Sequence, residues 1–178
     1  MTAVQTKHPE TVGVTTGRTS RLLAIAGVLA LVVGLGSLSG GIFGAWYTYD
    51  QAVAQNVVTP DDAAIPETPV RGPFTMWAQS DIITHHQLES TGGLYYSGMD
   101  RVVPQLDEAG EPVLDETGEV VMVPNQARAS WINATVLTTA LGLGIVSYAL
   151  STFAIALGVT LVVAGYAFLH IRRRALLI

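Results

Sequence analysis

Two long stretches without any Asp, Glu, Lys or Arg constrain the fold more than any other feature of this chain. Leu22 to Tyr49 is free of such charges over 28 residues, and Ala129 to Ile171 is free of them over 43. A transmembrane helix needs about 20 consecutive apolar residues. Because 49% of the 178 residues are hydrophobic and 13% are charged, the chain is too apolar for an ordinary soluble domain. The sequence predicts a mainly α-helical membrane protein with two transmembrane helices.

The first predicted transmembrane helix covers residues 22–46. As a helix, Leu22 to Ala45 would be about 36 Å long, which exceeds the hydrocarbon core of about 30 Å and allows some tilt. Three aromatic residues follow it: Trp46, Tyr47 and Tyr49. Aromatic rings of this kind anchor a helix end at the headgroup level, so they are expected to mark the outer end of the first span.

A cleaved signal peptide is the alternative interpretation of this region. Lys7, Arg18 and Arg21 precede the apolar stretch, and residues 52–54 resemble a small-residue cleavage site. The apolar core of a signal peptide is only about 7–15 residues long. The greater length of the stretch seen here favours a retained helix.

The second apolar region covers residues 132–171 and ends at the triplet Arg172 to Arg174. Cytoplasmic segments of membrane proteins are enriched in Lys and Arg, and both ends of this chain are basic. We therefore expect both termini in the cytoplasm and an even number of crossings. The second crossing is predicted near residues 147–169, after a helical or partly unwound approach.

The segment between the spans, residues 47–131, is strongly acidic. It contains 13 Asp and Glu residues against three Arg, a net charge of −10. Such a segment suits the extracytoplasmic side of a plasma membrane and argues against nucleic acid or an anionic lipid surface as its partner. We expect a multi-pass protein of a plasma membrane, with integral membrane proteins and the lipid bilayer as its partners.

Short basic tails, residues 1–21 and 172–178, are expected at the two ends of the chain. Local signals divide the external segment into three parts. Residues 56–73 hold four of the eight prolines and are expected to form an extended linker. Residues 75–91 are expected to form a short helix that stops at Gly92-Gly93. An eight-residue repeat begins at Leu106 and Leu114, and its Asp-x-x-Gly pattern predicts a small acidic β-meander over 102–123. The spacing of a calcium-binding loop is missing.

Four side chains of the external helix are candidates for chemistry: Asp81, His85, His86 and Glu89. Three of them recur at intervals of four and therefore share one helix face. This face predicts either a divalent-metal site or a group that responds to pH near neutrality. The alternative is a solvated polar face at a partner surface. No catalytic residue, no cofactor and no enzymatic activity are predicted, and the chain has no Cys.

Small residues inside the predicted spans form the clearest interaction pattern. In the first span Gly36, Gly40 and Gly44 are spaced by four, and in the second span Ala154 and Gly158 repeat this spacing. Small residues at this interval let two helix backbones approach closely in lipid. They predict that the two spans pack against each other, that the first span also contacts another subunit, or both. On the external helix, Trp77 is the predicted contact residue.

The sequence Trp77 to Gly93, with Tyr95 and Asp100-Arg101 after it, resembles a group of small two-span membrane proteins of actinobacteria. Members often carry the label of aromatic ring-opening dioxygenase. That chemistry needs an iron cage of His and carboxylate ligands in a closed substrate pocket, and about 60 structured external residues are too few for both. The acidic repeat at 106–121 is an insertion relative to this group.

Two functions are compatible with these features. The first is a non-enzymatic accessory or structural subunit of a plasma-membrane complex, for which an actinobacterial respiratory cytochrome supercomplex is one host. The second is a metal- or pH-responsive membrane module that uses the external Asp/His/Glu helix face.

Overall fold

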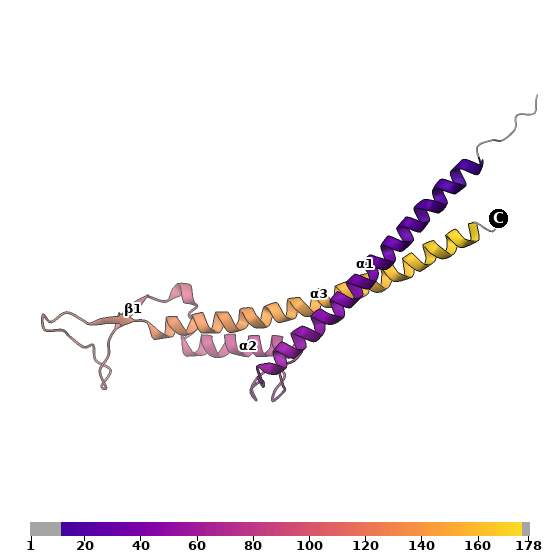
Figure 1. Ribbon diagram of the computed structural model, residues 1–178. Coiled ribbons are helices and arrows are strands. Elements are labelled where there is room, and N and C mark those ends of the chain that lie inside the picture. Colours follow the sequence, from indigo (N-terminus) through magenta and orange to yellow (C-terminus); the bar gives the residue numbers. More distant parts are fainter. Residues whose placement is uncertain (1–11, 176–178) are drawn as a thin grey trace, which may run out of the picture. The chain divides into compact units, whose positions relative to one another are not determined.

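The computed structural model describes residues 12–175, with side chains from 17 to 174. Its elements are helices α1 (Val12–Ala54), α2 (Pro73–Ser90) and α3 (Gln126–Ala175), the 3-10 helix η1 (Tyr96–Gly98) and strands β1 (Val102–Pro104) and β2 (Met122–Pro124) (Figure 1). They form two units, residues 12–47 with 149–175 and residues 48–148. The outermost parts of both predicted basic tails, Lys7 included, lie outside the described residues.

The predicted mainly helical architecture with two long apolar helices is confirmed. The most apolar 18-residue windows of Gly17–Ala54 and Gln126–Arg174 have mean hydropathies of 2.4 and 2.1, and both helices are long and apolar enough to cross a membrane. Of the two forms expected for the approach to the second span, the helical one is found. Helix α3 is continuous over 50 residues, which is about 75 Å at 1.5 Å per residue.

The first unit is a pair of antiparallel helices. Gly27 of α1 lies against Gly165 and Leu169 of α3, whereas Gly41, further along α1, lies against Ser151 and Ile155. Because the contact residues increase in number along α1 and decrease in number along α3, the two helices are antiparallel. Within this unit the N-terminal part of α1 therefore runs along the C-terminal part of α3, and the two helices diverge toward their ends (Figure 1).

In the second unit, α2 packs along the N-terminal part of α3 (Figure 1). Pro73 starts α2 at a position where a missing backbone N–H costs nothing, and the hydroxyl of Thr75 accepts the backbone N–H groups of Arg71 and Gly72. The helix stops where Gly92 and Gly93 take positive φ, at 61° and 82°, as the sequence predicts. Its buried residues are Met76, Ala78 and Ile82, and those of α3 in this unit are Trp131 and Ala134.

The Pro-rich segment is a closed loop, so its prediction as an extended linker is wrong. Val58 pairs with Pro69 across the loop, and the backbone N–H of Val70 donates to the carbonyl of Val57 at 2.9 Å. Thr59, 2% exposed, donates its hydroxyl to the Ile65 carbonyl at 2.5 Å. The prolines fix backbone angles without preventing closure, because the buried Thr59 hydroxyl also bonds to the backbone carbonyl and N–H of Thr68 across the loop.

The acidic repeat forms two short arms on a two-stranded stem. β1 and β2 pair antiparallel, with Val103 opposite Val123. Each arm turns at a glycine with positive φ, Gly110 at 82° and Gly118 at 84°, as the Asp-x-x-Gly pattern predicts. In the second arm Thr117 and the backbone N–H of Glu119 donate to Asp115. These bonds stabilise the charged carboxylate and lower the pKa of Asp115.

Where the arms and the stem meet, three backbone hydrogen bonds form a closed triangle. Gln105 donates its N–H to the carbonyl of Val121, Val121 donates to Val113, and Val113 donates to Gln105, at 2.8 to 2.9 Å. The three residues are eight apart, which is the length of the repeat. The prediction of a β-meander over 102–123 is therefore wrong: only β1 and β2 form a sheet, and the repeat is a junction of one stem and two arms.

Candidate interaction site

A row of small residues joins the two helices of the first unit. We call it the glycine seam, and its members are Ser20, Gly27, Gly34 and Gly41 on α1 and Ser151, Gly158 and Gly165 on α3. All seven are buried and recur at intervals of seven. A seven-residue repeat keeps one face of each helix toward its partner, as in a left-handed coiled coil.

The seam brings the helix backbones into direct contact. A Cβ atom added at Gly158 would lie 2.6 Å from the backbone nitrogen of Leu38 and 2.8 Å from the carbonyl oxygen of Gly34. Real Cβ atoms do not approach backbone atoms so closely. The Ser37 hydroxyl also donates to the Ala154 carbonyl across the seam at 2.9 Å. Close packing and interhelical hydrogen bonds are the forces that associate helices in lipid.

The structure separates the predicted small residues into two groups. Gly44, Ala154 and Gly158 contact the partner helix of the same chain. Gly36 and Gly40 have open space where a Cβ would be, and both are exposed. We call these two residues the open glycine face. The sequence prediction followed the four-residue spacing of Gly36, Gly40 and Gly44 and therefore missed the glycine seam. The seam residues recur just as regularly, at intervals of seven.

Large apolar side chains cover the outer surface of α1 in the first unit. Ile25, Val32 and Phe43 are 65%, 64% and 61% exposed. Residues 12–47 and 149–175 contain no acidic side chain. An apolar exterior around a seam of small residues is the inverse of a soluble helix pair, and it suits a lipid environment or the surface of another membrane protein.

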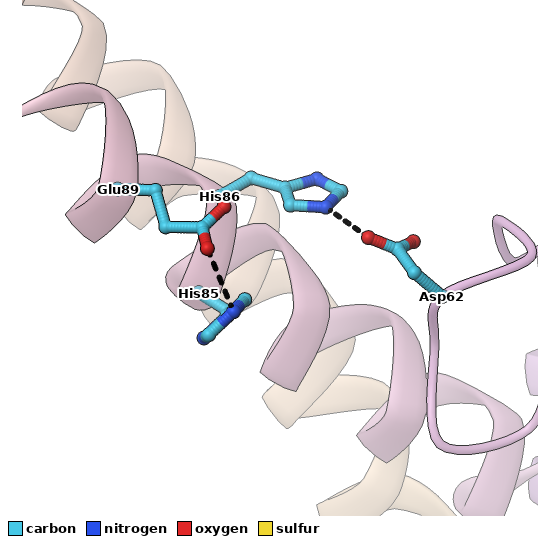
Figure 2. A network of polar contacts seen from close by, with 4 residues as sticks. All are labelled: Asp62, His85, His86 and Glu89. Atoms are coloured by element: carbon cyan, nitrogen blue, oxygen red, sulfur yellow. Dashed lines mark hydrogen bonds and ion pairs between the residues drawn. The ribbon is translucent and has the colours of Figure 1, made fainter.

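The histidine face of α2 makes two polar contacts (Figure 2). His86 Nε2 lies 2.6 Å from Asp62 Oδ2, and His85 Nε2 lies 3.2 Å from Glu89 Oε1. The hydrogen bond to His86 favours the charged form of the carboxylate and lowers the pKa of Asp62. Asp62 belongs to the Pro-rich loop, so the first contact connects that loop to α2.

The predicted metal ligands do not gather at one point. His85 and His86 turn to different carboxylates in Figure 2, and their ring centroids are 6.4 Å apart. Asp81 takes part in neither contact. Among the residues that the structure describes, no three His, Cys, Asp or Glu side chains converge closely enough to hold a metal ion. The arrangement is a pair of surface contacts, and sequence reasoning missed Asp62 because it lies 24 residues away from His86.

Trp131, near the start of α3, contacts the segment that follows α2. Its side chain is 6% exposed, its indole N–H donates to the Leu94 carbonyl at 2.9 Å, and its ring stacks on Tyr95 with centroids 5.2 Å apart. Nearby, the guanidinium of Arg128 lies 3.8 Å from the ring centroid of Tyr96. These contacts fix the chain that leaves α2. Trp77, predicted to contact a partner, is 52% exposed.

No protein family model matches the sequence, and no similar chain was found among curated proteins or among solved structures.

Proposed function

We propose that this chain is a non-enzymatic accessory subunit of a plasma-membrane complex. Its first unit crosses the bilayer as a helical hairpin, and its second unit lies outside the cytoplasm. The resemblance in the sequence Trp77 to Gly93 suggests an actinobacterial host, and a respiratory cytochrome supercomplex is the assembly we favour. The role is to hold or stabilise larger subunits by contacts in the membrane and outside it.

The observation that carries this proposal is the division of small residues in the first unit. The glycine seam accounts for the packing of α1 on α3, but Gly36 and Gly40 lie away from it with open space above them. Packing within the hairpin therefore does not account for these two glycines. Two neighbouring glycines that lower helix propensity by about 1 kcal/mol each are readily explained if a second backbone approaches there.

We expect Gly40→Leu to separate this chain from its partner. The substitution adds bulk to a contact that tolerates none, and the lipid tails offer no compensating hydrophobic gain. A loss of about 1–3 kcal/mol, as in overpacked cores, weakens association by about fivefold to more than a hundredfold. The measurement is affinity purification from the native host in mild detergent, with quantification of every protein that accompanies the chain.

The matched control is Ser39→Leu, which adds similar bulk at an exposed position of α1 that points about 100° away from Gly40 around the helix. It should leave the accompanying proteins at the wild-type ratio. Both variants should reach normal membrane levels, since each raises the hydrophobicity of the span. If Gly40→Leu keeps every accompanying protein at the wild-type ratio, the open glycine face binds no subunit and the proposal loses its support.

The proposed orientation places both termini in the cytoplasm. The antiparallel pair of the first unit supports a shared side for both termini, and the arginines near both ends favour the cytoplasmic side. Since the chain has no Cys, single cysteines at Thr16 and Thr117 report on their own positions. In intact cells an impermeant maleimide should label Thr117→Cys and leave Thr16→Cys unlabelled. Labelling of Thr16→Cys would contradict the proposed orientation and place the N-terminus outside.

A further inference from the structure

The antiparallel helices bring two basic segments together. Arg18 and Arg21 lie near the start of α1, and Arg172 to Arg174 end α3. One seven-residue step along the seam beyond the contact of Gly27 with Gly165 places Ser20 opposite Arg172. Ser20 is 9% exposed, as expected of a seam residue. Measured along the helix axes, the five arginines from opposite ends of the sequence therefore lie within about one helical turn of this point. We call them the arginine end.

No acidic group balances these charges within the described part of the first unit. Residues 12–47 and 149–175 contain no Asp or Glu, and both ion pairs of the described chain involve residues of the second unit. Four of the five arginines are exposed and Arg172 is half-buried. The Nε of Arg172 is buried and has no hydrogen-bond partner among the described atoms. The arginine end is therefore positively charged, and its guanidinium N–H groups can donate to a ligand.

We propose that the arginine end binds the headgroup of an anionic phospholipid, most tightly one with two phosphates. The inference rests on the proposed membrane insertion, which puts the ends of both helices at the level of the headgroups. A guanidinium presents a planar fork of N–H donors that matches two phosphate oxygens. Arginines from two helices surround a headgroup better than one helix end does, and basic sites between transmembrane helices are suited to lipids with multiple charges.

The charge distribution of the chain also determines on which side of the membrane this lipid binds. The external segment, residues 47–131, carries a net charge of −10 and repels anionic headgroups. Only the opposite end of the hairpin attracts them. The lipid would thus bridge the two helix ends and reinforce the pairing that the glycine seam begins.

The experiment measures lipids that remain bound to the purified full-length chain in nonionic detergent, by native mass spectrometry. The probes are diphosphatidylglycerol, phosphatidylglycerol and phosphatidylcholine, each titrated separately. We expect binding to decrease in that order. Replacing Arg172, Arg173 and Arg174 by Gln should weaken diphosphatidylglycerol binding by about fivefold for each arginine. The control, Arg71→Gln with Arg101→Gln, removes two arginines of the second unit and should bind as wild type does.

Two further measurements make the outcome decisive. Replacing the same three arginines by Lys keeps the charge but loses the forked geometry, and should bind between wild type and the Gln variant. Inorganic phosphate should not displace the lipid at equal concentration; complete displacement would identify free phosphate as the ligand and overturn the proposal. Equal binding of the anionic lipids and phosphatidylcholine would also overturn it. Gly40→Leu should bind lipid normally, so failure of the subunit proposal is distinguishable from failure of this one.

Discussion

Gly34→Leu is expected to disrupt the helical hairpin, whereas Gly36→Leu, two residues away, is expected to leave it intact. A Cβ at Gly34 would lie 2.9 Å from the backbone nitrogen of Val162 and 3.0 Å from the carbonyl of Gly158. A Cβ at Gly36 would meet nothing within 4 Å. Because backbone atoms cannot turn aside as a side chain can, we expect a cost of about 1–3 kcal/mol, or about fivefold to more than a hundredfold in helix pairing.

A disulfide across the seam provides the measurement. The chain contains no Cys, and the Ser37 hydroxyl lies 2.9 Å from the Ala154 carbonyl, so Ser37→Cys with Ala154→Cys reports on pairing alone. The initial rate of cross-linking in membranes should fall with Gly34→Leu and stay unchanged with Gly36→Leu. Equal rates in the two variants would show that the seam does not hold the helices together. Gly36→Leu should still reduce co-purification of a partner, since it alters the open glycine face.

Trp131→Ala is expected to have the largest effect on the second unit. It removes a nearly buried indole that stacks on Tyr95 and donates to Leu94. Truncation of a buried Trp costs about 3–5 kcal/mol, which raises the opening equilibrium by a hundredfold or more. Hydrogen exchange of the full-length chain in detergent should show this increase at α2 and at residues 91–99. Helix α1 between residues 20 and 45 should exchange as before.

Two further substitutions separate the causes. Trp131→Phe keeps an aromatic ring but loses the indole donor, and a hydrogen bond contributes about 1 kcal/mol. The cost should stay near that value, because the Leu94 carbonyl still accepts the Thr91 hydroxyl at 2.7 Å. Trp77→Ala truncates a tryptophan that is 52% exposed and should change exchange little. If Trp131→Ala and Trp77→Ala behave alike, Trp131 is not the centre of this contact.

Features that depend on neighbouring residues were predictable from the sequence. The apolar helices follow from charge-free runs, and the stop of α2 follows from Gly92-Gly93. The turns of the acidic arms follow from an Asp and a Gly three residues apart. In each case the deciding groups lie within a few residues of one another, so propensity and spacing suffice.

Features that depend on distant residues were not predictable in the same way. Closure of the Pro-rich loop needs the Thr59 hydroxyl to reach carbonyls six and nine residues away, whereas prolines alone suggest an extended chain. The partner of His86 is Asp62 and not a residue of its own helix. The glycine seam becomes visible only when two segments more than 100 residues apart are compared at the same seven-residue interval.

The stem of the acidic arms has a consequence for how this protein can vary. Val102 pairs with Pro124, and the backbone N–H of Asn125 donates to the Arg101 carbonyl at 3.0 Å, so the chain leaves this region where it entered. Asn125 also caps the start of α3 by accepting the N–H of Arg128. The residues between the two strands therefore branch from the rest of the second unit at a single point. The length and the charge of this branch can change in evolution without displacing either helix, so the fold constrains this part of the molecule least.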